Sequence, residues 1–447
     1  MQTKVSTDLE IFTSDETFSL DELVLRLKKL FENHAYSSIL HAFLDFFQGS
    51  LISKAATGRL AGHEGQWYAK DGTYRKMLRT SLGEFEMKMV RMKDPVTGRK
   101  LCPLRDFLGL KRYQTKSNEL EKEVVEAVSS DSYRNSHDLL VHTSSLGVTH
   151  QTMHNWVLNT RCDEIDVPGG IADATPLQVL PDGTGYKGPG CGGKAVKGEL
   201  KIAIGVNTSG HVFPLGSWAG TSWKEIADEW KSQKVKFPDG SILVSDGELG
   251  LSEAFAGLIP ERQRCQWHTV RDLYHMMHAD GGLAKESRPY QDRLAALMAI
   301  ELPREDFAKV DDDEKTRITE LMNSSEAEVA RLIAELQARG YEVAVNYLTR
   351  AASSMFGYVK RWLRTGLIGY RASSVVERVM RAIGRRIKKI AYGWKEKGVC
   401  KVAKILLKRF ADEAEWKSYW DKLFFATNPR VAVTFEITGV TNSSHNF

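Results

Sequence analysis

The spacing of apolar and polar residues predicts a mostly helical first third of the chain that contains one β-hairpin. Apolar residues recur at helical spacing after a capping box at 19–22 and again over 38–47, which predicts two packed helices. Between Leu78 and Arg91 the pattern changes to strict alternation, and the turn-forming segment 94–98 follows. This combination favours a small β-hairpin.

Residues 117–160 return to helical spacing, and their last part has the rhythm of a helix, a short turn at Gly147 and a second helix. Thr149 is the expected cap of the second helix. The arrangement predicts a helix-turn-helix whose second helix reads a DNA major groove, and plain packing within an all-α domain is the alternative. The side chains expected to face DNA are His150, Gln151, His154 and Asn155.

Beyond residue 176 the pattern becomes that of an α/β domain. Strands are expected at 177–180, 200–206, 212–218, 242–244 and 263–267, with helices at 222–232 and 248–258. The first strand is expected to end at Asp182, and the fourth delivers Asp246 into a turn at Gly247. This order of elements predicts a ribonuclease H-like fold, in which the first and fourth strands lie side by side and chemistry gathers at the strand ends.

Asp182 and Asp246 would then face each other across neighbouring strands. Two carboxylates this close are costly unless a cation neutralises them, and hard oxygen ligands favour Mg²⁺. Glu377, in the first turn of a helix capped by Ser373 or Ser374, is the candidate third carboxylate. The alternatives are an ordinary Ser-Asp-Gly turn at Asp246 and an ordinary ion-pair partner at Glu377.

The segment 279–366 reads as a helical insertion before Glu377. Within it, the acidic run 311–314 is expected to be a solvated loop. The complete division predicted from the sequence is an N-terminal helical and hairpin region at 1–115, a helix-turn-helix region at 116–167, the first part of the core at 168–278, the insertion at 279–366, and completion of the core with basic helices at 367–447.

Charge is distributed unevenly along the chain. Sixteen Lys or Arg and two acids fall between Lys360 and Arg409, although the net charge of the whole chain is only +5. Such a block, with interleaved aromatic residues, predicts a nucleic-acid channel, and a solvated helical face is the alternative. The cations expected to contact DNA phosphates are Arg378, Arg381, Arg385, Arg386, Lys388 and Lys389. Six phosphate contacts would give a log–log salt slope of roughly −5.

The remaining composition indicates the cellular setting. No apolar run reaches the length of a membrane span, and the first residues lack the shape of a signal peptide. Five scattered cysteines suit reduced thiols better than a disulfide framework. A cytoplasmic, nucleoid-associated protein is therefore expected.

Several motifs in order resemble one family. They are DGT at Asp182, IAIGVNTSG from Ile202, LGSW from Leu215, SDGELGLSEAF from Ser245, QRCQWHTVRDL from Gln263 and VVERVMRAIGRR from Val375. In this order the chain resembles the DDE transposases of bacterial insertion sequences related to Mutator elements, over roughly 176–389. The resemblance implies that Asp182, Asp246 and Glu377 bind the catalytic metals, with a Cys-x-x-His pair at Cys265 and His268.

The same resemblance implies a reaction and partners. Two Mg²⁺ ions, which Mn²⁺ can replace, would assist nicking at an element end and then attack of the freed 3′-hydroxyl on target DNA. Transposon ends and target DNA are the expected partners, and a homodimer or larger assembly on DNA is expected. The alternatives are an inactive, domesticated transposase acting as a DNA-binding regulator and a ribonuclease H-like nuclease without strand transfer.

The pair Cys265 and His268 has two readings. Cys-x-x-His is half of a zinc site, and two more histidines follow at 275 and 278. A complete structural zinc site needs four ligands, and no second cysteine lies nearby in the sequence. A structural or DNA-positioning role beside the active centre is the expectation.

Overall fold

The computed structural model describes residues 24, 35–144, 147–165, 175–190, 195–390 and 393–424. They form a mixed α/β structure with two β-sheets, and their contacts divide the chain into two compact units. We call residues 1–123, 138–148 and 417–447 the smaller unit, and residues 124–137 and 149–416 the larger unit. The first helix expected from the sequence, at 19–31, lies outside the described residues except for Val24.

The smaller unit is built on a β-hairpin and one long helix. Its elements are α2 (Tyr36–Ala56), β1 (Ala69–Thr80), β2 (Gly83–Lys93), β3 (Lys100–Leu101) and α3 (Pro103–Phe107). β1 pairs antiparallel with β2, and β2 pairs with β3 across the predicted turn at 94–98. Met87 and Met89 are buried whereas Glu86 and Lys88 are exposed, which confirms the alternation. The longer β1–β2 hairpin was not foreseen.

Three helices follow along the chain, α4 (Asn118–Ser130), α5 (Tyr133–Ser144) and α6 (His150–Asn159). The side chain of Thr149 accepts a hydrogen bond from the backbone of Thr152 and caps α6, as predicted. Met153 and Val157 are the buried residues of α6. The last described helix of the chain is α16 (Glu413–Phe424).

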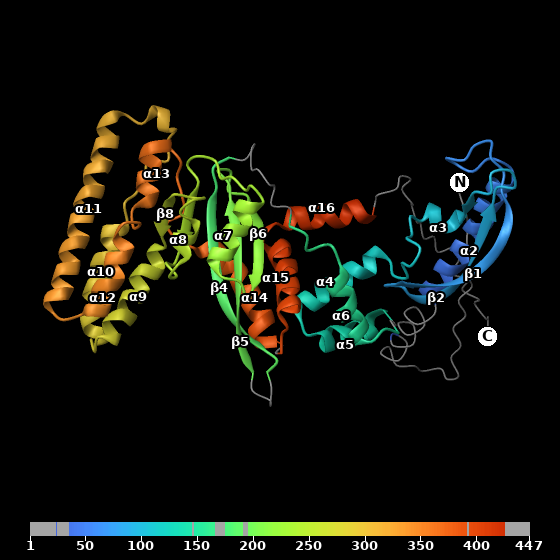
Figure 1. Ribbon diagram of the computed structural model, residues 1–447, viewed down its shortest axis with the longest axis horizontal. Coiled ribbons are helices and arrows are strands. Elements are labelled where there is room, and N and C mark those ends of the chain that lie inside the picture. The colour runs from blue at the N-terminus through green and yellow to red at the C-terminus, as the bar shows by residue number, and fades with distance from the viewer. Residues whose placement is uncertain are drawn as a thin grey trace, which may run out of the picture. The chain divides into compact units, whose positions relative to one another are not determined.

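A five-stranded sheet forms the centre of the larger unit (Figure 1). Its strands are β4 (Gln178–Gly188), β5 (Val196–Val206), β6 (Val212–Ala219), β7 (Ile242–Ser245) and β8 (Glu261–Arg264), in the order β6-β5-β4-β7-β8. β4, β5 and β6 are antiparallel neighbours, whereas β4 pairs with β7 in parallel. The expected adjacency of the first and fourth strands is therefore confirmed.

Helices cover both faces of this sheet. α7 (Trp223–Ser232) and α8 (Leu251–Phe255) share an apolar cluster with Leu177, Val179 and Ala203. Successive side chains on a strand point to opposite faces, so the buried Leu180 and Ile202 belong to the other face. There α14 (Ser374–Gly384) packs against β4, and α15 (Glu396–Ala411) packs against β5 and β6.

A helical bundle adjoins β8. It consists of α9 (Gln266–Ala279), α10 (Ala284–Met298), α11 (Asp312–Ala338), α12 (Glu342–Ala352) and α13 (Gly357–Thr365), with the short turn η3 (Phe307–Lys309) between α10 and α11. Leu273 and Met277 of α9 belong to the core of this bundle, which therefore begins before the predicted boundary at residue 279. The predicted insertion is thus helical, as expected.

The acidic run at 311–314 is not the solvated loop predicted from the sequence. Asp311 caps α11 through a hydrogen bond from the backbone of Glu314, and the next three acids form the first turn. Negative charge at a helix N-terminus is favourable because the helix dipole and free N–H groups are positive there. Charge density alone was therefore a misleading guide at this position.

No helix within the described ranges combines the length and the apolar character that a membrane crossing demands.

Gly357 joins the bundle to the sheet. A Cβ at this position would lie 1.9 Å from the carbonyl oxygen of Arg262 on β8, so the two backbones are in close contact. We expect Gly357→Ala to lower stability by about 1–3 kcal/mol, because backbone atoms must separate to admit the methyl group. Gly384→Ala is the matched control, since nothing lies within 4 Å of its Cβ position. Thermal unfolding of both variants checks this, and equal midpoints would contradict it.

Candidate active site

Asp182 lies inside β4 and not at its end as predicted. β4 pairs with β5 from Gln178 to Gly188, and Asp182 stands opposite Ile202. The glycine-rich segment continues as a strand because the ring of Tyr186 covers Gly198 on the neighbouring strand, where a Cβ would lie 2.3 Å from the ring. Such aromatic cover compensates for the missing side chain of a strand glycine. Asp182 shares a strand face with Leu180, which is the face that α14 covers.

Asp246 follows directly after β7, as predicted. The parallel pairing joins Gln178 with Ile242 and Val179 with Leu243, and the same register continued along the strands puts Asp246 level with Asp182. Gly247 has a φ of +85°, which allows the tight exit from the strand. The side chain of Asp246 is exposed and accepts a hydrogen bond from the backbone N–H of Glu248 at 3.1 Å.

Glu377 lies in the first turn of α14, where the sequence predicted it. Val375, Val376, Val379 and Ile383 are the buried residues of this helix. Ser373 is the N-cap residue, but its hydroxyl makes no capping bond to the backbone. It donates instead to the carboxylate of Glu377, with 2.9 Å between Oγ and Oε1. The predicted cap residue therefore orients the acid.

Cys265 and His268 join this arrangement from the start of α9. Cys265 Sγ lies 3.2 Å from His268 Nδ1, and the Ser373 hydroxyl lies 3.3 Å from each of these two atoms. His268 Nδ1 is also 3.7 Å from Glu377 Oε1. Ser373 thus stands within hydrogen-bond distance of all three residues. We call Cys265, His268, Ser373 and Glu377 the cysteine–histidine network.

This network shifts the titration of its members. Burial raises the pKa of the Cys265 thiol, but hydrogen bonds from His268 and Ser373 outweigh burial, and the net pKa is lowered. Burial lowers the pKa of His268, but the hydrogen bond to Cys265 and the charge of that group outweigh it, and the net pKa is raised. Both shifts favour the charged pair of thiolate and imidazolium.

Asp182 is the most strongly perturbed carboxyl of the site. Burial, followed by the nearby charge of Asp246, raises its pKa from 3.8 to about 7. Glu377 raises it further, whereas the backbone N–H of Gly183 and the charge of His268 lower it. The three predicted acids therefore interact electrostatically although they come from β4, the end of β7 and α14.

The donor set of these acids fits a hard divalent cation. Three carboxylates supply the oxygen ligands that Mg²⁺ and Mn²⁺ prefer, and a cation would relieve the repulsion between Asp182 and Asp246. In the described part of the chain, however, the group whose ligand atoms all lie within 4.8 Å of one another is Cys265, His268 and Glu377. Asp182, Asp246 and Glu377 together are not such a group among the described residues.

The Cys265, His268 and Glu377 group has the ligand types of a zinc site. It offers three protein ligands, which is one fewer than a structural zinc site requires. Their polar atoms already have partners through Ser373. The positioning role expected for the Cys-x-x-His pair stays a prediction.

A second set of charged groups near Asp182 was missed by the sequence analysis. The side of β4 opposite to Asp182, at Gly183, lies within 4 Å of carboxylate oxygens of Glu199 and Glu248. Lys201 is buried on β5, binds Glu199 at 2.5 Å and lies over the ring of Trp223. Burial is the main cause of a raised pKa at Glu248. Only its spacing, two residues after Asp246, could have suggested Glu248.

The predicted phosphate-binding cations fall into two groups. Exposed side chains belong to Arg378, Arg381, Arg385, Lys388 and Lys389. Arg386 is only 1% exposed. Its Nε donates to the carbonyl of Val128 at 2.7 Å, and its guanidinium lies over the rings of Tyr133 and Trp394. Burial lowers its pKa to about 10. We therefore withdraw Arg386 from the predicted DNA contacts and retain the other five.

These residues occupy the end of α14 and a π-helical segment, η4 (Arg385–Ile390). Widening of a helix to the π form often accompanies functional sites. Here it turns Arg386 inward while Arg385, Lys388 and Lys389 remain exposed. Sequence spacing alone cannot distinguish these orientations, because a π turn changes which residues share a helix face.

The predicted DNA-reading residues lie on α6. Gln151 and Asn155 are exposed, and their side chains contact each other at 3.4 Å. His154 is half-buried, with its ring 5.0 Å from that of Tyr133 in an edge-on contact. Three of the four predicted readers, His150, Gln151 and Asn155, are therefore exposed on the helix, and His154 packs partly against α5.

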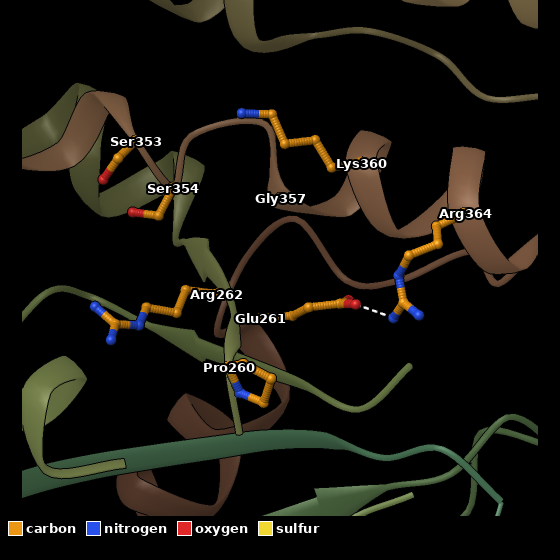
Figure 2. A pocket seen from close by; sticks show the side chains of 8 residues that line it. All are labelled: Pro260, Glu261, Arg262, Ser353, Ser354, Gly357, Lys360 and Arg364. Carbon is orange, nitrogen blue, oxygen red and sulfur yellow. Dashed lines mark hydrogen bonds and ion pairs between the residues drawn. The ribbon is translucent and has the colours of Figure 1, made fainter. Parts of the chain in front are cut away.

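A separate pocket of about 320 Å³ lies between β8 and the turn that connects α12 with α13 (Figure 2). Its cations are largely paired with acids. Arg364 binds Glu261 and Asp239, and Lys360 binds Glu326 at 2.8 Å. The pocket shares no lining residue with the three carboxylates. The three carboxylates, whose charges act on one another, remain the better candidate for chemistry.

No protein-family model matches the chain, and no curated protein matches it significantly.

Asp182 provides a stability test of the site. The pKa of this carboxyl is 3.8 in the unfolded chain and is raised by burial and by Asp246 to about 7 in the folded protein. The cost of ionising it in the folded state therefore appears above pH 4, grows to about pH 7 and is then constant. We expect Asp182→Asn to raise the unfolding midpoint in EDTA by on the order of several degrees at pH 8 and by little at pH 4.

Thermal unfolding at both pH values measures this difference. Glu320→Gln, which alters an exposed carboxyl on α11, is the matched control and should behave like the unaltered protein. Added Mg²⁺ should narrow the gap between Asp182→Asn and the unaltered protein. A lower midpoint for Asp182→Asn at pH 8 in EDTA would show that the buried charge is not under strain.

Proposed function

We propose that this protein is a metal-dependent DNA transposase. The proposed reaction is hydrolysis of a phosphodiester at an element end, followed by attack of the freed 3′-hydroxyl on target DNA. The observation that carries the proposal is the parallel register of β4 and β7, which puts Asp246 level with Asp182. Burial and the charge of Asp246, with a smaller contribution from Glu377, raise the pKa of Asp182 accordingly. Three motifs far apart in the sequence thus supply acids that influence one another, as a metal-binding set requires.

The fold assignment within this proposal is a ribonuclease H-like core. The strand order β6-β5-β4-β7-β8, an antiparallel meander continued by two parallel strands, supports it. In chain order, Asp182 lies on the first strand of this sheet, β4, and Asp246 follows the fourth, β7. This placement also supports the assignment. The helical bundle between Asp246 and Glu377 corresponds to the insertion that the sequence resemblance implies.

Asp182, Asp246 and Glu377 would hold two Mg²⁺ ions, or Mn²⁺ in their place. When bound, such ions make an attacking oxygen more acidic and stabilise the leaving oxygen. The chain's own contribution is positioning. Ser373 and His268 orient the carboxylate of Glu377, and the sheet fixes Asp182.

DNA binding in this proposal uses two surfaces. The exposed cations of α14 and η4 follow Glu377 directly and would neutralise phosphates near the cut. Gln151 and Asn155 on α6 would read element ends in a major groove. A homodimer or larger assembly is part of the proposal, because two element ends must be joined to one target.

The direct test is cleavage of labelled DNA that carries the element's own ends. Mg²⁺ or Mn²⁺ should support nicking at the ends, EDTA should abolish it, and Asp246→Asn should reduce it by at least about a hundredfold while DNA binding survives. Glu253→Gln, which alters an exposed acid on α8, is the matched control and should cleave normally.

The outcomes separate the proposed function from its rivals. Products joined to a second DNA support a transposase, whereas nicking without joining indicates a nuclease. Tight binding of element ends without any cleavage in Mg²⁺ or Mn²⁺ would indicate a regulator. Equal cleavage by the unaltered protein and Asp246→Asn would refute the carboxylate assignment.

Salt dependence tests the cationic surface. Five exposed cations that each neutralise one phosphate give a log–log slope of roughly −4.5 for duplex binding, and Lys388→Gln should make it shallower by about 0.9. Arg386→Gln should instead lower thermal stability and leave the slope unchanged, since its guanidinium is buried. Binding titrations at salt concentrations from about 50 to about 200 mM measure both slopes. An unchanged slope for Lys388→Gln would exclude this residue from the interface.

A further inference from the structure

The first turns of α9 carry an exposed aromatic and cationic surface. Trp267 is 53% exposed, whereas every other tryptophan within the described part of the larger unit is buried or half-buried. The guanidinium of Arg271, one helical turn further on, lies 4.6 Å from the centre of its ring. We call Trp267 and Arg271 the stacking pair. Single exposed apolar residues are ordinary, so the position of the pair must decide its meaning.

The stacking pair lies close to Glu377. The ring of Trp267 is 4.8 Å from that of His268, and His268 is 3.7 Å from the carboxylate of Glu377. One imidazole therefore separates the indole from Glu377. Arg271 is close enough for its charge to lower the pKa of His268. The surface next to the candidate site is thus aromatic and not merely polar.

The two residues that precede Trp267 are held by hydrogen bonds to other parts of the chain. The N–H of Cys265 donates to Ser245 at the end of β7, and the N–H of Gln266 donates to Arg371. The side chain of Gln266 also donates to the carbonyl of Met298 at 2.6 Å. The bond from Cys265 ties the start of α9 to β7, the strand that delivers Asp246. A side chain on such an anchored turn loses little freedom when it binds a ligand.

The chemistry of the pair selects a flat, electron-rich ligand. Nucleic-acid bases stack on tryptophan with roughly 1–3 kcal/mol per base, whatever their sequence. Arg271 also binds Asp272, with Nε and Oδ1 2.6 Å apart, so much of its charge is neutralised locally. The pair therefore offers a stacking face more than an attraction for phosphate. Bases within a duplex have both faces covered, which leaves an unpaired base as the ligand that fits.

We infer that Trp267, supported by Arg271, stacks on an unpaired DNA base next to the phosphodiester at the carboxylate site. The inference rests on the proposed function, because it takes the strand cut by this protein as its ligand. It adds that the DNA is locally unpaired at the site of reaction. The stacked base would hold the strand while the three acids and their metals act on the neighbouring phosphate.

The test uses the full chain and a duplex with a short 3′ overhang that contains 2-aminopurine, in EDTA so that no cleavage occurs. Binding should quench the fluorescence of 2-aminopurine through stacking on the indole. Trp267→Ala should lose most of the quenching and bind the overhang DNA roughly 5- to 100-fold more weakly. Affinity for the fully paired duplex should stay the same. Trp267→Phe should retain quenching, and Trp267→Leu should not.

Trp67→Ala is the matched control, since Trp67 is a 69% exposed tryptophan of the smaller unit. It should leave both quenching and affinity unchanged. Thermal unfolding of Trp267→Ala should match that of the unaltered protein, because the side chain is exposed. Quenching and affinity that survive in Trp267→Ala would overturn the inference.

Metal-dependent nicking, measured on the same preparations, reports on the proposed function separately. Nicking with undiminished quenching in Trp267→Ala leaves the function intact and refutes the stacking role. Quenching that depends on Trp267 in a protein that never nicks supports base stacking and refutes the transposase.

Discussion

The parallel pairing of β4 with β7 is the constraint on which the candidate site depends. Only two residue pairs form it, Gln178 with Ile242 and Val179 with Leu243. Parallel strands cannot be joined by a tight turn, so the chain must travel through β5, β6 and α7 before it returns. That route brings together two acids that lie far apart in the sequence. The same pairing forces their like charges into proximity.

The fold tolerates this repulsion because its apolar packing is extensive nearby. Trp223, Trp230 and Phe255 fill the space between the sheet and the helices α7 and α8. Burial of each large aromatic side chain contributes on the order of a few kcal/mol, which is comparable to the cost of one strained carboxyl. Free energy gained on one face of the sheet can thus offset an unfavourable charge on the other. Sites that bind cations commonly have this character.

The sequence predicted the parts of the molecule that depend on local pattern. Strand β7, the exit at Gly247, the helix α7 and the position of Glu377 in the first turn of α14 follow from short-range spacing and turn chemistry. The extension of β4 beyond Asp182 depends on pairing with β5 and on the cover of Gly198 by Tyr186, which no local pattern reports. The acidic start of α11 was misread because charge was weighed without the helix dipole.

The site itself was predictable only in part. The three acids could be named because each lies in a recognisable motif, but their spacing could not. The role of Ser373 depends on a contact with Cys265, 108 residues away. Arg386 could not be told from its exposed neighbours, since the π-helical turn that buries it is invisible in the residue pattern. The metal-binding and DNA-binding roles stay predictions.

The burial of Arg386 also gives the larger unit a mechanical connection. Its guanidinium lies over the ring of Tyr133, and that ring meets His154 on α6. Its backbone continues from α14, which carries Glu377. A shift of α6 against a ligand would therefore press through two aromatic contacts and one arginine onto the helix that holds the third acid. Under the proposed function, a movement of α6 on binding DNA would then be transmitted to Glu377. The strength of this coupling would depend on the packing around the guanidinium of Arg386.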